Sequence, residues 1–220
     1  TVMVKNIQSG GSSSSSSSNH LTAVGNTLYF TANDGTNGIE LWKSDGTSSG
    51  TMMVKDIYSS SSSSSPGHLT AVGNTLYFTA NDGTNGIELW KSDGTSSGTV
   101  MVKNIQSGGS SSSSSPNHLT AVGNTLYFSA NDGTNKIELW KSDGTSSGTV
   151  MVKNINSAYD SNPAVLTPIG NTLYFRAHDG SNGNELWKSD GTSSGTVMVK
   201  DINSGVSGSS PDYLTAVGST

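Results

Sequence analysis

Two carboxylates recur at a fixed spacing along the chain, as in Glu40 and Asp45, and such a pair could do acid–base chemistry. Glycoside hydrolysis, for example, needs two carboxylates at a set separation in one cleft. Here the pair returns four times, always inside the stretch Glu-Leu-Trp-Lys-Ser-Asp-Gly-Thr, which fits architecture better than one active site. We therefore predict no catalytic residue and no enzyme. We expect the glutamate to pair with a lysine such as Lys5 or Lys43, and the aspartates to close turns: Asp45, Asp93, Asp143 and Asp190.

A second set of carboxylates lies in oxygen-rich turns such as residues 33–37, Asn-Asp-Gly-Thr-Asn, and calcium takes oxygen ligands. The spacing matches neither an EF-hand loop nor the Gly-Gly-x-Gly-x-Asp nonapeptide of calcium β-rolls. Hairpin turns use the same residue types. The chain also has no cysteine, which excludes thiol catalysis and cysteine-ligated zinc. We predict no metal and no cofactor, and keep as calcium candidates Asp34, Asp82, Asp132 and Asp179.

The histidines offer little chemistry. His20, His68 and His118 occupy one position of the repeat, and the same position holds Val165 and Tyr213 in other copies. A metal ligand or general base would not be replaced by valine, so we expect a structural role.

The fourth copy of the repeat departs from the others at polar positions, with Arg176, His178 and Asn184. An enzyme would require one copy to differ at several clustered polar positions, so this alternative stays open. His178 lies in a turn beside Asp179, and we expect it to be solvated.

The tryptophans share one position of the repeat and recur roughly every 50 residues. One interpretation makes them platforms for stacking sugar rings, one per repeat. The other makes them core residues, where a large ring buries the most area. Leu41 precedes Trp42 and faces the opposite way in a strand, so both faces of the sheet need cover. We favour the core for Trp42, Trp90, Trp140 and Trp187.

The pattern of apolar and turn residues predicts four antiparallel strands in each repeat. In the second copy they cover residues 69–72, 75–80, 87–91 and 99–105. Apolar residues alternate with period two in these short runs, which are rich in β-branched and aromatic residues. In one run, Leu76, Phe78 and Ala80 point to one face of the sheet. Gly73-Asn74 predicts a two-residue hairpin with positive φ.

A four-stranded sheet of this size cannot bury a core alone, so neighbouring sheets must cover one another. We therefore predict an all-β fold of tandem four-stranded antiparallel blades, either β-propeller-like or an open superhelical stack. The predicted segments are the last strand of a preceding repeat at 1–7, repeats at 21–57, 69–105, 119–155 and 166–202, and the first strand of a following repeat at 214–220. Linkers fill 8–20, 58–68, 106–118, 156–165 and 203–213.

With these strands in view, the chain resembles the bacterial tandem-repeat proteins named for the consensus Glu-Leu-Trp-x-x-Asp-Gly-Thr. The matching residues begin at Glu40, Glu88, Glu138 and Glu185, with a Leu-Tyr-Phe strand before each and a Gly-Thr pair after it. The resemblance covers nearly the whole chain except the linkers. It implies blade-like repeats in very large secreted or cell-surface proteins, and it carries no catalytic residue to this chain.

The linkers contain serine runs, which predict either flexible connections or densely O-glycosylated ones. No Asn-x-Ser/Thr sequence occurs in the chain, so any glycan would be O-linked. The glycosylation candidates are Ser12, Ser14, Ser16, Ser61, Ser63, Ser111, Ser113, Thr31 and Thr47.

Composition narrows the function further. The 220 residues carry a net charge of −5, and Arg176 is the single arginine, unlike a nucleic-acid binder. No apolar run is long enough for a membrane span. We predict a non-enzymatic, extracellular or cell-surface structural protein that self-associates, as a segment of a fibre, surface layer or adhesin stalk. The alternative is a lectin-like β-propeller with one carbohydrate pocket per repeat.

Overall fold

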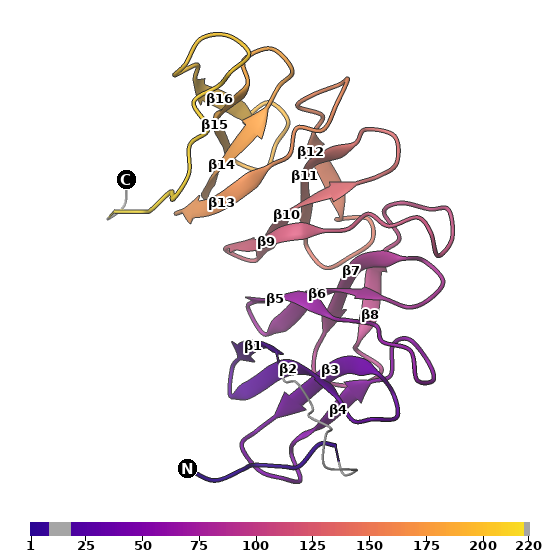
Figure 1. The fold of residues 1–220 in the computed structure, drawn as a ribbon. Coiled ribbons are helices and arrows are strands. Elements are labelled where there is room, and N and C mark those ends of the chain that lie inside the picture. The colour runs from indigo at the N-terminus through magenta and orange to yellow at the C-terminus, as the bar shows by residue number, and fades with distance from the viewer. Residues whose placement is uncertain (9–18, 218–220) are drawn as a thin grey trace. The chain divides into compact units, whose positions relative to one another are not determined.

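The computed structural model describes residues 1–8 and 19–217, and within them it is all-β, with four antiparallel four-stranded sheets (Figure 1). No helix long and apolar enough to cross a membrane lies in this part of the chain. The sheets contain, in order, β1 (Asn19–Val24), β2 (Thr27–Asn33), β3 (Ile39–Ser44) and β4 (Met52–Lys55); β5 (Gly67–Val72), β6 (Thr75–Asn81), β7 (Ile87–Ser92) and β8 (Val100–Lys103); β9 (Asn117–Val122), β10 (Thr125–Asn131), β11 (Ile137–Ser142) and β12 (Val150–Lys153); β13 (Ala164–Ile169), β14 (Thr172–His178), β15 (Asn184–Ser189) and β16 (Val197–Lys200).

Local sequence explains the strands of each sheet. In the second sheet, the hairpin between β5 and β6 turns at Gly73, whose φ of 57° is left-handed, while Asn74 keeps a negative φ. This pattern matches a type II′ turn, which takes glycine at its first central position. Within each sheet the strands follow chain order, so every neighbour is reached by a short hairpin. The predicted fold class is therefore confirmed.

The position shared by three histidines lies at an irregularity of the first strand. The pairing of β5 with β6 shifts between Gly67 and Thr70, and His68 between them has a φ of 53°. The equivalent Val165 has a φ of 56°. Burial, and secondarily the charge of His20, lowers the pKa of His68. This position of the repeat thus requires a left-handed backbone conformation and does not require an imidazole side chain.

Two boundaries differ from the sequence prediction. The fourth strand is shorter than predicted: Val100–Lys103 instead of 99–105. Residues 1–7 and 214–217, predicted as strands of neighbouring repeats, form no strand in the described part of the chain. A strand exists only by pairing, and no described strand of another sheet lies alongside these segments to pair with them.

The chain divides into two compact units. Unit 1 comprises residues 1–104 and 108–113, with the first two sheets, and unit 2 comprises residues 105–107 and from 114 onward, with the last two. In unit 1 the core lies between the two sheets. The first sheet contributes Tyr29, Leu41, Val54 and Ile57, and the second contributes Leu76, Phe78, Ala80 and Trp90.

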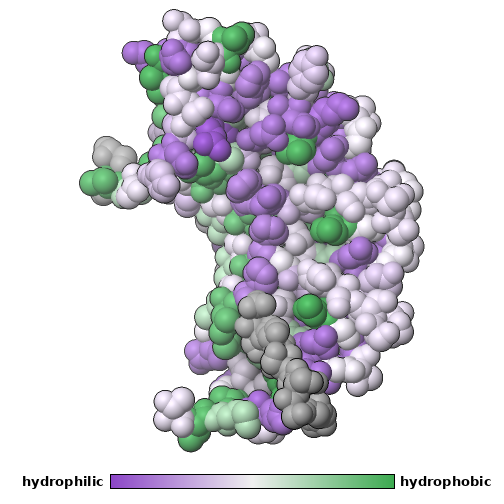
Figure 2. Space-filling model, in the orientation of Figure 1, coloured by the Kyte–Doolittle hydropathy of each residue, from purple (hydrophilic) through white to green (hydrophobic). Residues whose placement is uncertain are grey.

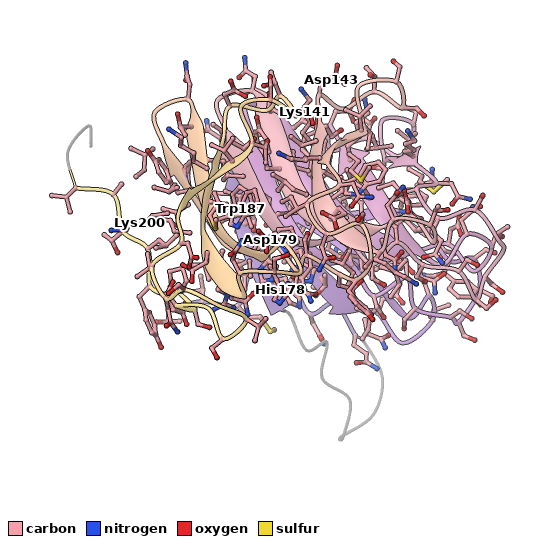
Figure 3. All side chains as sticks on the ribbon, turned by 90° about the horizontal axis from the view of Figure 1, so that it is seen from above. Lys141, Asp143, His178, Asp179, Trp187 and Lys200 are labelled. Carbon is pink, nitrogen blue, oxygen red and sulfur yellow. The ribbon has the colours of Figure 1, made fainter. Side chains whose placement is uncertain are left out.

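Unit 2 repeats this arrangement with its own two sheets. The third sheet contributes Tyr127, Leu139, Val152 and Ile155, and the fourth contributes Leu173, Phe175, Ala177 and Trp187. The rings of Phe175 and Trp187 lie 6.5 Å apart, as those of Phe78 and Trp90 do. Figure 3 labels Trp187 beside the strands of the fourth sheet.

Each sheet therefore has two different faces, which we call the Tyr–Leu face and the Phe–Trp face. In both units the Tyr–Leu face of one sheet packs against the Phe–Trp face of the next. Leu41 and Trp42 are neighbours in β3 but belong to different clusters, as period two requires. This head-to-tail contact is heterologous and leaves a free face at each end of a stack.

Lysines add polar contacts between adjacent sheets. Lys55 donates through Nζ to the carbonyl oxygen of Thr99 at 2.8 Å, and Lys43 donates to that of Gly94 at 2.8 Å. Unit 2 has the same pair of contacts, from Lys153 to Thr196 and from Lys141 to Gly191, each 2.8 Å long. The lysines thus bind backbone carbonyls of the next sheet, so the predicted pairing with the glutamates is wrong.

Polar and weakly polar residues cover most of the surface seen in Figure 2, and strongly apolar residues lie there in small separate patches. This distribution agrees with the sparse charge and the many serine, threonine and glycine residues of the chain.

Candidate functional site: the linker–sheet junction and its cavity

The glutamate that opens each Glu-Leu-Trp stretch is a buried anchor for the linker that follows. Glu40 is fully buried. Its Oε1 accepts from the backbone N–H of Ser64 at 2.8 Å, and its Oε2 accepts from the Ser64 hydroxyl at 2.5 Å and from the N–H of Ile57 at 3.0 Å. Burial raises the pKa of Glu40, although these hydrogen bonds oppose the shift. One carboxylate therefore holds both ends of the linker between the first two sheets.

The same junction recurs in unit 2. Glu138 accepts from the N–H of Ile155 at 2.9 Å, the N–H of Asn156 at 3.3 Å and the Ser161 hydroxyl at 2.7 Å. Burial raises its pKa to about 6, against hydrogen bonds that lower it, led by the one from Ser161.

Glu185 in the fourth sheet behaves differently. Burial again raises its pKa, but the hydrogen bonds from Ser209, Ile202 and Asn203 outweigh burial and the net shift is downward. The physical reason is that no further sheet of the described chain lies over this junction, so desolvation is weaker.

The linkers also hydrogen-bond to both of the sheets they connect. The Ser64 carbonyl accepts from the N–H of Asn81 at 3.0 Å, and the Ser63 hydroxyl accepts from the N–H of Ile39 at 2.9 Å. Specific hydrogen bonds thus hold the described linkers against the sheets, and these linkers are not purely flexible connections. Sequence reasoning missed this, although a signal existed: the anchoring serine is followed two residues later by proline even where the serine run is lost, as at Ser161 and Pro163.

The predicted glycosylation sites fall into three groups. Ser12, Ser14 and Ser16 lie outside the described residues. Thr31 is buried, Ser63 and Ser113 accept backbone hydrogen bonds, and the Thr47 hydroxyl donates to Asp45. Only Ser61 and Ser111 among the described candidates are exposed with no hydrogen bond in the described structure.

The predicted calcium ligands are engaged in their own turns. Asp34 accepts through Oδ1 from the N–H groups of Thr36 and Asn37, and through Oδ2 from the Asn37 amide at 2.7 Å. The same bonds recur at Asp82, Asp132 and Asp179. Burial raises the pKa of Asp34, but these bonds outweigh it and the pKa is lowered. Among residues 1–8 and 19–217, no three acidic, histidine or cysteine side chains group as a metal site would need.

The aspartates of the Asp-Gly-Thr turns have a similar role. Asp45 accepts through Oδ1 from both the N–H and the hydroxyl of Thr47, and the hydroxyl bond holds the pKa of Asp45 below its usual value. Asp93, Asp143 and Asp190 accept the same bonds. Glu40 and Asp45 thus belong to separate local structures and share no cleft.

The tryptophan side chains are each only 6% exposed: Trp42, Trp90, Trp140 and Trp187. A platform for a sugar needs an open ring face, and a side chain that is 6% exposed does not offer one. The geometry therefore favours the core interpretation over the stacking one.

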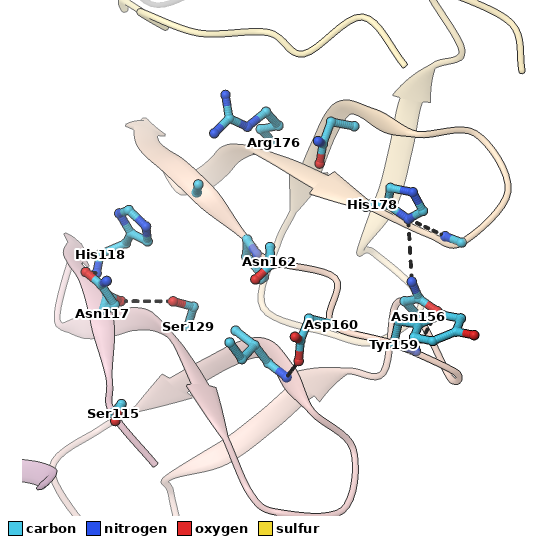
Figure 4. A pocket seen from close by; sticks show the side chains of 15 residues that line it. Ser115, Asn117, His118, Ser129, Asn156, Tyr159, Asp160, Asn162, Arg176 and His178 are labelled. Atoms are coloured by element: carbon cyan, nitrogen blue, oxygen red, sulfur yellow. Dashed lines mark hydrogen bonds between the residues drawn. The ribbon is translucent and has the colours of Figure 1, made fainter. Parts of the chain in front are cut away.

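A cavity of about 680 Å³ lies between the third and fourth sheets of unit 2 (Figure 4). Its walls come from β9, the start of β11, the linker at 156–163 and β14. Arg176 and His178, two of the side chains that set the fourth repeat apart, project from β14 in Figure 4, and Asn184 completes the wall. The structure thus brings these three residues to one site.

No protein-family model and no curated protein matches the chain. Similar solved structures include a putative TolB from Agrobacterium tumefaciens, at 12% identity and a TM-score of 0.46, which matches 83% of this chain and 64% of that one. A puromycin hydrolase mutant complexed with PGG matches 81% of this chain and 28% of its own, at 12% identity and a TM-score of 0.52. TolB from Acinetobacter baumannii matches 75% of this chain and 38% of its own, at 12% identity and a TM-score of 0.43.

The chain thus spans less than two thirds of the length of these proteins. At such identity the likeness to the puromycin hydrolase concerns the fold alone: repeated four-stranded sheets of the β-propeller kind.

Proposed function

We propose that the chain is a non-enzymatic structural repeat protein of the cell exterior, a segment of a fibre, surface layer or adhesin stalk that associates with copies of itself. The observation that supports this proposal is the packing that recurs in both units, where the Tyr–Leu face of one sheet contacts the Phe–Trp face of the next. On the Tyr–Leu face of the fourth sheet, Val199 and Ile202 are 45% and 56% exposed, whereas the equivalent Val54 and Ile57 are 6% and 8% exposed beneath the second sheet.

The occupant that fits this face is the Phe–Trp face of the first sheet of a second copy. Both units already contain that contact, so the two surfaces are complementary by construction. Residues 1–8 show how the first sheet receives such a neighbour. Ile7 packs against Phe30 and Trp42, and Lys5 donates to the Thr51 carbonyl at 2.7 Å, as Lys55 does to Thr99.

Self-association of this kind suits a structural protein because each added copy leaves the same free face at its end. The exposed Ser61 and Ser111 would lie on the outside of such an assembly and are the positions we propose for O-linked glycans. The buried tryptophans give the lectin-like alternative no support.

Sedimentation velocity over a range of concentrations tests the proposal, together with electron microscopy of concentrated samples. We expect the chain to form larger species as concentration rises. Leu186→Asp should abolish them, because it puts a charge on the Tyr–Leu face. Val206→Asp makes the same kind of change on a linker side chain that is 77% exposed, and it should have no effect.

Removal of residues 1–8 should strengthen association by freeing the Phe–Trp face. A chain that stays monomeric at every concentration, or a Leu186→Asp variant that associates like the wild type, would refute the proposal.

A further inference from the structure

The linker between the third and fourth sheets has an aspartate where the earlier linkers have serine. In unit 1 the N–H of Ile39 donates to the Ser63 hydroxyl at 2.9 Å, and the N–H of Ile87 donates to that of Ser113 at 2.9 Å. In unit 2 the equivalent Ile137 donates its N–H to Oδ1 of Asp160 at 2.8 Å. Asp160 therefore replaces the serine as the acceptor that holds the linker to the sheet.

Asp160 has more acceptor capacity than this contact needs. A hydroxyl offers one oxygen, whereas a carboxylate offers two oxygens and a negative charge. Within the described part of the chain, Oδ2 of Asp160 has no donor, and no lysine, arginine or histidine pairs with the carboxylate. The side chain is partly exposed and lines the cavity of unit 2. The fold thus leaves one oxygen and the charge of Asp160 free for a ligand.

Asn162 is a second replacement of the same kind. Its φ of 46° matches that of Ser65 at 47° and Ser115 at 44°, so the backbone is kept while the side chain changes. Its amide makes no hydrogen bond with any described residue, and it lines the same cavity. In Figure 4 the side chains of Asp160 and Asn162 lie between Ser129 of the third sheet and the fourth sheet. An amide can both donate to and accept from a hydroxyl group.

Unit 1 provides an internal comparison. At the same place it has a cavity of about 340 Å³, whose wall includes Thr31 and Ser65 at the positions of Ser129 and Asn162. The cavity of unit 2 has about 680 Å³, and side chains of the third linker extend its wall. The larger volume and the additional polar groups therefore occur together, in one of the two units.

The remaining wall adds neutral polar groups and one aromatic ring. The Ser129 hydroxyl donates to the Asn117 carbonyl at 3.4 Å and can still accept. Oδ1 of Asn117 accepts from the N–H of His118 at 2.7 Å, which leaves its amide N–H groups as donors. Tyr159 lines the rim and is 73% exposed, so its ring can lie against a ligand.

Arg176 borders the cavity but does not neutralise Asp160. Period two along β14 and the pairing of Arg176 with Leu186 put its side chain on the Tyr–Leu face of the fourth sheet, which is turned away from the third sheet. Among the described residues, Asp160 is therefore the side chain that brings a full charge to the cavity, and this charge is negative.

We propose that this cavity binds an amino sugar, with Asp160 holding its ammonium group and the amides of Asn162 and Asn117 holding its hydroxyls. A hydrogen bond between an ammonium and a carboxylate is charge-assisted and roughly twice as strong as a neutral one. The cavity volume lies within the range of small-molecule sites, about 300–1,000 Å³. The site is separate from the tryptophans and from the faces of self-association.

Isothermal titration calorimetry with glucosamine tests the proposal, with glucose, N-acetylglucosamine and ethanolamine as controls at equal ionic strength. We expect saturable binding of glucosamine at one site per chain. The first two controls lack the ammonium group, and ethanolamine lacks the sugar ring. Each control should bind at least about tenfold more weakly, which corresponds to about 1.4 kcal/mol.

The chain offers matched variants. Asp160→Asn keeps an acceptor for Ile137 and removes the charge, and Asp160→Ser restores the residue found at Ser63. Both should weaken glucosamine binding at least about tenfold. Asp212→Asn also removes one negative charge, restores the residue found at Asn117, lies outside the cavity and should leave binding unchanged. Thermal unfolding of the three variants checks that the fold is kept.

Absence of saturable glucosamine binding to the wild type would overturn the proposal. So would equal binding of any of the three control compounds, an Asp160→Asn variant that binds like the wild type, or an equal loss of binding in the Asp212→Asn variant.

Discussion

Replacement of one serine in the run at 59–65 should destabilise unit 1, while replacement of a near neighbour should not. The Ser64 hydroxyl is buried and donates to Oε2 of Glu40 at 2.5 Å. A hydrogen bond to a charged group contributes about 1.5–3 kcal/mol to stability. Ser64→Ala should therefore lower the free energy of unfolding by about this amount, because the buried carboxylate loses a donor and gains none.

Ser61→Ala is the matched control, since Ser61 is exposed in the same run and makes no hydrogen bond in the described structure. An exposed substitution of this kind stays within about 0.5 kcal/mol of the wild type. Urea unfolding followed by circular dichroism and tryptophan fluorescence measures both free energies by linear extrapolation.

The pH dependence gives a second readout. Below about pH 4, where Glu40 is protonated, the Ser64→Ala penalty should fall toward that of a neutral hydrogen bond, about 0.5–1.5 kcal/mol. If Ser64→Ala and Ser61→Ala agree within about 0.5 kcal/mol at pH 7, the linker is not anchored by Glu40 and the reasoning fails.

Three further outcomes follow from the structure. Trp90→Ala should cost about 3–5 kcal/mol of unfolding free energy, measured in urea, and a loss below about 1 kcal/mol would contradict the core assignment. Glu138 has its pKa raised from 4.5 to about 6, so the folded state binds more protons between these values. Unit 2 should gain about 1–2 kcal/mol as the pH falls from 7 to 4.5, and a Glu138→Gln variant that keeps this gain would exclude Glu138 as its source. Gly38→Ala should be clearly more destabilising than Gly25→Ala, because a Cβ at Gly38 would collide with the Ser62 backbone. Gly25→Ala should cost about 1–2 kcal/mol of unfolding free energy for its φ of 58°, since a Cβ there meets no atom within 4 Å. Equal losses would contradict the close approach of the linker to Gly38.

Much of the fold was predictable because its signals are local. The alternation in Leu76, Phe78 and Ala80 predicted one face of a strand, and the structure places these residues in one cluster. The opposite orientation of Leu41 and Trp42 followed from the same period and is confirmed. Turn chemistry placed Gly73 correctly, since glycine is the residue for which positive φ has no steric cost.

The role of Glu40 was not predictable in this way. Its serine partner lies 24 residues away, inside a run in which every position has the same side chain. Composition suggested flexibility or glycosylation for that run, whereas one hydroxyl is a buried donor and others are exposed. The distinction depends on which residue meets the carboxylate, and that is a property of the packed sheets.

The sequence by itself determined the repeat, the strands and their two faces, because period two and turn residues act over a few neighbouring positions. Only the tertiary structure decided where the linkers are anchored and where a cavity opens. Ser129, Asp160 and Asn162 come from a strand and from the linker that follows the third sheet, and they line one cavity because the third and fourth sheets pack together.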